Sequence, residues 1–403
     1  MSKLDDLIKK LCPNNVEYKY LGDICEIKTG KGITKKDITE NGKYPIISGG
    51  KEPMGLYHLS NRKANTVTIS RVGASGFVNY IEVDFYLNDK CFSIIPISKY
   101  EKKIDSKYIY EYLKNNEEKI SAMQSEGGVP TINTKKVSSI AIAVPPLEVQ
   151  REIVRILDNF TELNKELNKE LEYRKKQYVY YRDLLLSDDV LLKLTNKYSN
   201  SSTLEYKKLG DVGDFISGLK NKNKNDFKNG NVRFVPYLNV YSNIKVNMDK
   251  LEYVNINKDE NQNKLKYGDI LFTISSETKE ECGITSVFTY NGNENIYLNS
   301  FCFALRPYSN INLNPEFSKY IFTHKNIRKK IIKTANGVTR FNISKNALKE
   351  IQIPIPPLEV QEKIVEILDN FTELTESITD GLPAEIDNRN KQYTYYRDKL
   401  LSF

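Results

Sequence analysis

Histidine, cysteine and long apolar runs are all scarce in this chain of 403 residues. Its two histidines, His58 and His324, are too few and too far apart in the sequence to predict a metal site or a Ser–His catalytic site. The cysteines form no Cys-x-x-Cys pair and lie at Cys12, Cys25, Cys91, Cys282 and Cys302. Such an odd, scattered set argues against a zinc ribbon or a disulfide framework. We therefore expect a cytoplasmic protein without a metal of its own.

The apolar runs are too short for a membrane protein. The longest nearly apolar run, residues 140–147, contains two prolines, whereas a spanning helix needs about 20 apolar residues. The first residues carry acids where a signal peptide needs an apolar core, so we expect neither a span nor a signal peptide. A hydrophobic fraction of 39% still predicts globular domains. The formal charge of +8 permits a polyanionic partner without requiring one.

The chain contains an internal repeat. Three motifs occur twice: Pro145–Gln150 as Pro356–Gln361, Ile156–Leu163 as Ile367–Leu374, and Lys176–Asp183 as Lys391–Asp398. The starts of the copies also match, as do two landmarks inside them, Tyr86-Leu87-Asn88 with Cys91 and Tyr297-Leu298-Asn299 with Cys302. A period of about 200 residues is too long for a solenoid. Constant ends around divergent bodies are typical of a duplicated scaffold that carries two different recognition surfaces.

Each divergent body has the pattern of an α+β domain. Short β-branched and aromatic runs alternate with Gly, Asn, Ser and Pro, which predicts strands. Short helices are expected near residues 106–119 and 316–333. Cys91 and Cys302 stand in apolar, β-rich runs and are interpreted as buried small hydrophobic residues.

Each body is followed by a long amphipathic segment. Apolar residues recur there in steps of three and four, which predicts a coiled-coil seam. The predicted core residues are Ile153, Ile156, Phe160, Leu163, Leu167, Leu171, Tyr178, Leu185, Ile364, Ile367, Phe371, Leu374, Ile378, Ile386, Tyr393 and Leu400. A continuous helix over 147–187 would be about 60 Å long, too long for one small domain to cover.

The two long helices are therefore expected to pair with each other. Pseudo-two-fold symmetry would make them antiparallel and return Phe403 to the first body. The second copy carries four extra residues near Gly381 and Pro383, where we expect the helix to loosen or kink. The alternative is an ordinary surface helix packed on its own domain.

Motifs of nucleotide-binding and catalytic sites are not found. Neither a P-loop nor an amino-methyltransferase (Asn/Asp)-Pro-Pro-aromatic tetrapeptide occurs in the sequence. Glu26-Ile27-Lys28 could mimic half of a nuclease site, but the second copy does not preserve it.

Taken together, these motifs resemble the specificity (S) subunits of type I restriction-modification enzymes. The resemblance rests on the paired Pro-Pro-Leu-Glu-Val-Gln and Lys-Gln-Tyr-x-Tyr-Tyr-Arg-Asp motifs, and on Gly337–Ile343 with its weaker counterpart 128–133. It implies two similar globular target recognition domains joined by two long antiparallel coiled-coil helices. The implied segments are recognition domains at 1–146 and 194–357, and spacer helices at 147–193 and 358–403.

The resemblance also implies a function. Each recognition domain would read one half of a bipartite site on double-stranded DNA, and the helices would set the half-site spacing and dock two methyltransferase (M) subunits. S-adenosylmethionine would belong to those subunits, and ATP and magnesium to two restriction (R) subunits. The chain itself would be non-catalytic and hold no cofactor. Two alternatives are a two-headed adaptor that binds only proteins and a stand-alone nuclease.

Base readout needs long polar side chains on loops that reach a groove. The candidates are Lys31, Lys35, Arg71, Lys90, Ser217, Lys220, Lys222, Lys224, Ser275, Ser276 and Arg340. Arg340, in the shared loop, is a better candidate for a phosphate or helix contact than for a base contact. For any one residue, solvated surface is at least as good an interpretation, so residues 220–228 together are the stronger electrostatic prediction.

Overall fold

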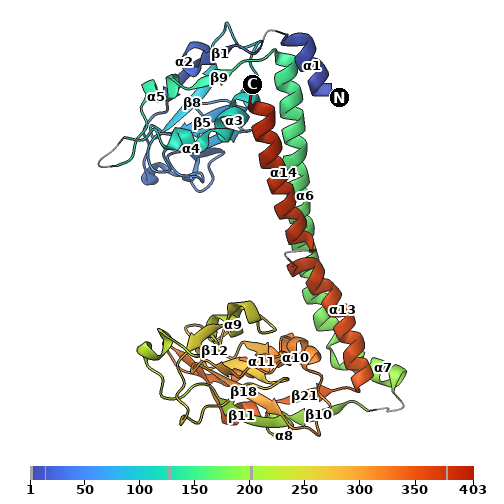
Figure 1. Cartoon of the computed structure of the whole chain (residues 1–403). Helices are drawn as coiled ribbons and strands as arrows, with labels where there is room; N and C mark the ends of the chain where they lie inside the picture. The colour runs from blue at the N-terminus through green and yellow to red at the C-terminus, as the bar shows by residue number, and fades with distance from the viewer. Residues whose placement is uncertain (1–2, 14, 126–128, 200–202, 378–379) are drawn as a thin grey trace. The chain divides into compact units, whose positions relative to one another are not determined.

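A computed structural model describes residues 3–13, 15–125, 129–199, 203–377 and 380–403. The chain divides into two compact units, which we call unit 1 (residues 1–169 and 384–403) and unit 2 (residues 170–383). Each unit contains one α+β body together with parts of the long helices, as the ribbon shows (Figure 1). The prediction of an α+β fold with two similar bodies and long helices is confirmed.

The body of unit 1 is built around a four-stranded sheet in the order β2-β8-β5-β6. A three-stranded sheet, β4-β3-β7, and the pair β1-β9 complete it. The strands are β1 Tyr18–Tyr20, β2 Cys25–Thr29, β3 Tyr44–Ile47, β4 Leu56–Tyr57, β5 Thr66–Ser70, β6 Val78–Ile81, β7 Tyr86–Leu87, β8 Cys91–Pro96 and β9 Ala141–Ala143. Every residue of β5 is buried, although its sequence alternates hydroxyl and apolar side chains, so both faces of this central strand are covered.

Short helices complete this body. They are α1 Lys3–Leu11, α2 Leu21–Ile24, η1 Lys35–Asp37, α3 Ser106–Asn115, α4 Glu117–Ser121 and α5 Thr134–Ser138. Helices α3 and α5 pack against strands of the main sheet. The side chain of Asp105 caps α3 by accepting from the backbone N–H groups of Lys107 and Tyr108. Helices α3 and α4 occupy the predicted helical region 106–119.

The body of unit 2 repeats this topology. Its sheets are β11-β18-β14-β16, β13-β12-β17 and the pair β10-β21, with an additional sheet β15-β20-β19. The strands are β10 Glu205–Lys208, β11 Gly213–Ser217, β12 Val232–Val235, β13 Glu252–Val254, β14 Ile270–Thr273, β15 Ser275–Ser276, β16 Thr285–Val287, β17 Ile296–Leu298, β18 Cys302–Pro307, β19 Ala335–Asn336, β20 Phe341–Ile343 and β21 Gln352–Ile355. The helices are α8 Leu209–Val212, η2 Lys224–Phe227, α9 Tyr237–Ser242, η3 Met248–Lys250, α10 Pro315–Ile321, α11 Lys325–Lys333 and α12 Lys345–Lys349.

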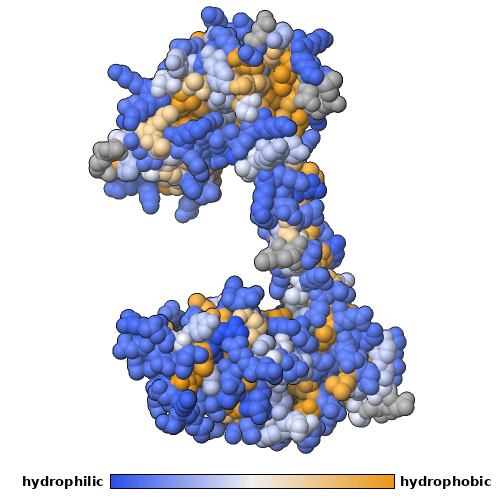
Figure 2. Space-filling view, viewed as in Figure 1, coloured by the Kyte–Doolittle hydropathy of each residue, from blue (hydrophilic) through white to orange (hydrophobic). Residues whose placement is uncertain are grey.

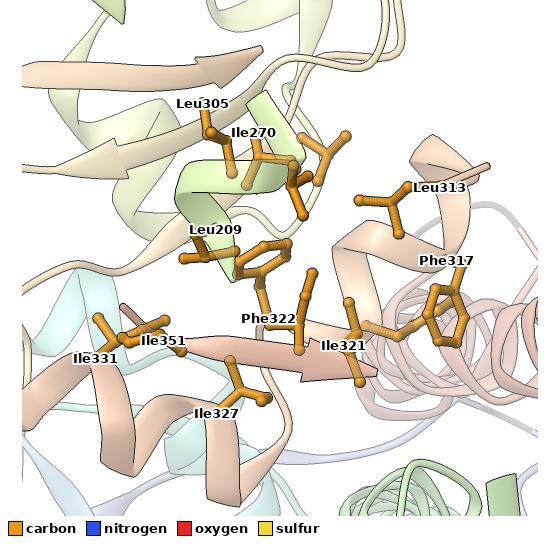
Figure 3. Close-up of a cluster of buried hydrophobic side chains, with 14 of the residues drawn as sticks. Leu209, Ile270, Leu305, Leu313, Phe317, Ile321, Phe322, Ile327, Ile331 and Ile351 are labelled. Carbon is orange, nitrogen blue, oxygen red and sulfur yellow. The ribbon is translucent and has the colours of Figure 1, made fainter. Parts of the chain in front are cut away.

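The core of unit 2 lies between its main sheet and helices α10 and α11. Phe322 sits among Leu209, Ile321 and Ile327, all buried (Figure 3). The ring of Phe272 stacks on that of Phe303 at 5.2 Å between centroids. Helices α10 and α11 occupy the predicted helical region 316–333 and supply one wall of this core.

The long helices differ in length from the sequence prediction. Helix α6 spans Leu147–Leu185, 39 residues, and a separate helix, α7 (Asp188–Tyr198), follows after Ser187. The second long segment is two helices, α13 (Leu358–Glu376) and α14 (Leu382–Leu401). Pro383 is tolerated because it stands in the first turn of α14, where its missing N–H has no helical acceptor. The expected interruption near Gly381 is thus a full break.

One glutamine anchors the start of each long helix to its body. The Gln150 side chain donates to the carbonyls of Lys103 and Pro145, at 3.0 and 2.7 Å, and accepts from Asp105 N–H at 2.9 Å. Gln361 makes the same three bonds in unit 2, to Asn312, Pro356 and Asn314, at 2.7–2.8 Å. Both side chains are buried, so the repeated Pro-Pro-Leu-Glu-Val-Gln motif is a helix-to-body joint.

The helices pair antiparallel within each unit. In unit 1, Phe160 of α6 stacks on Tyr396 of α14 at 5.5 Å, and Asn164 donates to the side chain of Asn390 at 3.0 Å. The C-terminal end returns to the body of unit 1, where Tyr18 OH donates to the Phe403 carbonyl. In unit 2, Phe371 of α13 stacks in the same way on Tyr181 of α6, at 5.5 Å.

The predicted seam residues occupy three kinds of environment. Ile153 and Ile364 are fully buried, and most of the others are half-buried: Ile156, Phe160, Leu167, Leu171, Tyr178, Leu185, Phe371, Ile386, Tyr393 and Leu400. Leu163, Ile367 and Leu374 are 46%, 41% and 37% exposed and lie outside the core. Two paired helices bury only one stripe each, and near its start each helix turns a different stripe toward its body, through Leu157 and Leu368. Ile378 lies outside the described residues.

Candidate nucleic-acid interface

The turn between β7 and β8 gathers three predicted DNA-contact residues in unit 1. The backbone N–H of Lys31 donates to the carbonyl of Leu87 at 3.1 Å, and that of Arg71 donates to the carbonyl of Lys90 at 2.9 Å. Lys90 N–H donates to the side-chain oxygen of Asn88 at 3.2 Å. Three loops far apart in the sequence therefore meet around one asparagine, and we call this group the unit 1 turn.

Asn88 holds the unit 1 turn together. Its side chain is 1% exposed and donates to the carbonyl of Ile33 at 2.9 Å. Its backbone N–H donates to Ile47 and its carbonyl accepts from Cys91. Lys35 follows on the same loop as Ile33 and is exposed at the start of η1, which a capping box between Thr34 and Asp37 fixes.

The three cations around Asn88 are free of internal partners. Lys31, Arg71 and Lys90 are exposed, and within the described part of the chain no hydrogen bond, ion pair or ring contact engages their side chains. Cationic side chains that the fold leaves unpaired and close together form a ready contact for phosphate groups and for base acceptors.

The same backbone frame recurs in unit 2, and we call it the unit 2 turn. Phe301 N–H donates to the side-chain oxygen of Asn299 at 2.8 Å. Leu219 N–H donates to the Leu298 carbonyl at 2.8 Å, and Ile274 N–H to the Phe301 carbonyl at 2.9 Å. Leu219, Ile274 and Phe301 thus stand where unit 1 has Lys31, Arg71 and Lys90.

The predicted basic loop of unit 2, residues 220–228, lies beside this turn. Lys220 and Lys224 are exposed, and Gln262 holds the backbone N–H and carbonyl of Lys220. Lys222 differs, because its ammonium pairs with Glu260 at 2.7 Å and its side chain is 3% exposed. The ion pair with Lys222 lowers the pKa of Glu260 to about 2. The charge of Lys222 is therefore paired within unit 2, whereas Lys220 and Lys224 form no ion pair among the described residues.

The predicted serines of unit 2 already have partners. Ser217 ends β11, and its carbonyl accepts from the Asn263 side chain at 3.0 Å. Ser275 is buried, and its hydroxyl accepts from Arg340 Nε at 3.2 Å. Ser276 donates to Glu281 at 2.9 Å. These contacts brace the shared loop, whereas Arg340 itself remains exposed.

Sequence reasoning missed four residues of these turns. Asn88 and Asn299 form the frame, and the recurring Tyr-Leu-Asn landmark was the signal that could have identified them. Phe301 is 57% exposed. Lys345 lies 4.8 Å from the centroid of the Phe303 ring, and burial and the nearby charge of Lys220 lower its pKa. The last two follow no motif, so only the folded structure reveals them.

The two cysteines beside the turns lie in the interior of their bodies. Cys91 and Cys302 are buried, and burial raises the pKa of each thiol to about 12, as expected of unreactive core residues. In the described ranges, no group of three or more His, Cys, Asp and Glu side chains could hold a metal ion. Nor does any helix of those ranges combine the length and apolarity needed to cross a bilayer.

Comparison with known proteins identifies the scaffold. The family model for the type I restriction modification DNA specificity domain matches twice, over residues 13–173 and 201–388. The chain belongs to this family. It is 30% identical to the specificity subunit of the type I restriction enzyme EcoR124I/EcoR124II from Escherichia coli, an alignment that covers 100% of this chain and 98% of that subunit. The chain is thus a specificity subunit and not a catalytic one.

Solved structures show the same fold at low identity. The HsdS subunit from Thermoanaerobacter tengcongensis matches with a TM-score of 0.51 and 17% identity, over 96% of this chain and 97% of that one. A chain from a study of complex assembly and conformational transition in a type I restriction-modification system matches with a TM-score of 0.59 and 16% identity, over 96% and 98%. Both specificity domains of this family member therefore have precedents for their architecture.

Proposed function

We propose that this specificity subunit reads a bipartite site on double-stranded DNA, with one half-site contacted by the unit 1 turn and the other by the unit 2 turn. The observation that carries the proposal is the shared backbone frame with different exposed side chains. Sequence is read by side chains that reach base edges, while backbone contacts only position a protein on DNA. One frame with two sets of side chains would therefore give two different half-sites.

The helices have a different role in this proposal. They set the spacing between the half-sites and dock two M subunits. Tyr180 and Tyr395, which are equivalent in the repeat, are 62% and 61% exposed. Large exposed aromatic residues are typical of binding surfaces, and two equivalent ones suit two copies of one partner. Figure 2 shows hydrophobic side chains at the surface of the helices among hydrophilic ones.

The reactions then take place on the partners. S-adenosylmethionine binds to the M subunits, which methylate adenine, and two R subunits bring ATP and magnesium for translocation and cleavage. This chain contributes sequence choice and needs no cofactor. Such a complex acts on the DNA of the cytoplasm.

Methylation mapping tests the proposal. The chain is expressed with its M subunit in a host without adenine methylation, and the methylated motif is read by long-read sequencing. We expect a split motif, and replacing residues 204–345 by another body should change one half of it only. A motif that survives this replacement unchanged would contradict the role of unit 2. Failure of the complex to bind any duplex would favour the protein adaptor.

A further inference from the structure

The two turns present opposite chemistry on the same frame. Three positions are equivalent by their hydrogen bonds: Lys31 and Leu219, Arg71 and Ile274, and Lys90 and Phe301. In unit 1 all three are cations, and in unit 2 all three are apolar. The fold of the turn requires neither kind of side chain, because the bonds that define it are made by backbone groups and by Asn88 or Asn299.

Of the apolar three, only Phe301 is left outside the core. Leu219 is buried with Phe234 and Val254 in a small cluster. Ile274 packs against the main core of unit 2. Phe301 is 57% exposed, and no other ring of the described chain contacts it. Single exposed apolar residues are common on protein surfaces, so the exposure of Phe301 matters here because it occurs at the frame position that carries Lys90 in unit 1.

The backbone of Phe301 is nevertheless fixed. Its N–H donates to Asn299 and its carbonyl accepts from Ile274 N–H. The backbone of Phe301 is thus held at the position that Lys90 occupies in unit 1. A rigid backbone that carries an exposed apolar ring is suited to a defined contact rather than to adaptable packing.

Two lysines lie near the unit 2 turn, since Lys220 directly follows Leu219 in the sequence. Lys345 lies over Phe303, two residues further along the chain from Phe301, and is electrostatically coupled to Lys220. Neither ammonium forms an ion pair among the described residues. Lysines without an ion pair near a base contact are suited to binding the phosphate groups of the same DNA. The partner chemistry that suits the whole group is a DNA groove with an apolar feature on a base edge.

We propose that Phe301 is a specificity-determining residue whose ring contacts the 5-methyl group of a thymine in the half-site of unit 2. In the major groove the thymine methyl is the apolar base feature, and phenylalanine is one of the side chains that contacts it. Lys90, at the equivalent position of unit 1, instead suits the acceptor atoms of guanine. This inference rests on the proposed function, because it requires unit 2 to read DNA.

Deoxyuridine substitution tests the contact one methyl group at a time. Each thymidine of the mapped unit 2 half-site is replaced singly by deoxyuridine, and binding to the complex of this chain with its M subunits is measured by competition. At one position the wild-type complex should lose about fourfold in affinity, the value of one buried methyl group. Phe301→Ala should bind the thymine and uracil duplexes equally.

Phe301→Leu is the matched variant, since it keeps an apolar side chain and should retain most of the penalty. Lys90→Ala should alter binding at the other half-site only. Phe301→Lys places the residue of unit 1 at this position and should abolish the loss of affinity on replacing thymine by uracil. This variant tests the methyl contact if Phe301→Ala fails to fold. Thermal unfolding monitors folding of each variant.

The other outcomes overturn the inference. A uracil penalty of equal size in wild type and Phe301→Ala would exclude methyl readout. If Phe301→Ala weakens binding but keeps the loss of affinity caused by uracil, Phe301 would insert between bases instead. If the variant loses its M subunits on purification, Phe301 would contact a protein. If the wild-type complex shows no motif at all, the proposed function fails first, and this result is distinguishable from the others.

Discussion

The unit 1 turn and the unit 2 turn have the same hydrogen bonds and different surfaces. Asn88 and Asn299 organise equivalent frames, yet the surface is cationic in unit 1 and presents a phenylalanine in unit 2. The comparison shows that the hydrogen bonds of the backbone and of the asparagine define the turn. The exposed side chains can therefore differ between the units without a change of fold. The helix-to-body joints differ from the turns in this respect. There the same buried side chain, Gln150 or Gln361, makes the same hydrogen bonds in both units.

The largest expected effect concerns the cations of the unit 1 turn. The triple change Lys31→Ala, Arg71→Ala and Lys90→Ala should weaken specific DNA binding on the order of 100-fold, since each lost contact to a phosphate or base costs about 1 kcal/mol or more. The slope of log affinity against log salt should fall by about 2 to 3. Phe301→Ala should leave this slope unchanged. Titrations at several salt concentrations measure both, and an unchanged slope in the triple variant would place the DNA elsewhere.

The joints should be the most sensitive points for folding. Gln150→Leu leaves two carbonyls and one N–H without their partner in the interior, which should cost about 3 kcal/mol of unfolding free energy. Gln361→Leu should cost a similar amount in unit 2. Urea unfolding measures both changes. Losses below about 1 kcal/mol would mean that water replaces the side chain, and the joint would not be structural.

Replacing Asn88 should destabilise the protein more than replacing Asn299. Asn88→Ala removes the bond to Lys90 N–H and the bond to the Ile33 carbonyl, and should cost about 2 kcal/mol because the site is buried. Asn299 is only half-buried, so Asn299→Ala should cost about half as much. Thermal unfolding of the two variants measures both losses, and a larger loss in Asn299→Ala would show that burial does not set the cost of removing this side chain.

The paired aromatic rings of the helices provide a smaller comparison. Phe160→Leu removes the stack on Tyr396, and Phe371→Leu removes the stack on Tyr181. Each should destabilise its unit by about 1 kcal/mol, the value of an aromatic pair beyond its area. Equal losses, measured by denaturant unfolding, would support one common seam. A loss in only one variant would show that the seam differs between the units.

The smallest expected effect is the pH dependence that Glu111 gives to the stability of unit 1. Burial raises the pKa of Glu111, whose carboxylate accepts from Tyr393 OH at 3.1 Å. A carboxyl with a raised folded pKa loses stability as the pH rises from its unfolded pKa, near 4.3, through its folded pKa. Glu111→Gln should therefore reduce the decline in stability above pH 4.3.

Much of the architecture was accessible from the sequence because it is periodic or repeated. The paired Pro-Pro-Leu-Glu-Val-Gln motifs located both helix starts, and the heptad-like spacing through Phe160 and Phe371 identified the seam. The sequence could not distinguish the exposed residues Leu163 and Ile367 from buried core residues. Periodicity predicts which residues lie on one face of a helix, but not which part of that face another element covers. Lys222 was indistinguishable from Lys220, since its partner Glu260 is distant in sequence.

The sequence alone determined the duplication, the long helices and the family, because these follow from local periodicity and from motifs that recur in order. Only the tertiary structure decided which side chains meet. The backbones of Lys31, Arg71 and Lys90 meet at the turn between β7 and β8, because sheet pairing brings distant loops together. Phe301, at the equivalent turn of unit 2, stays outside the core. Such neighbours are set by hydrogen bonds between residues far apart in the chain, and linear spacing carries no record of them.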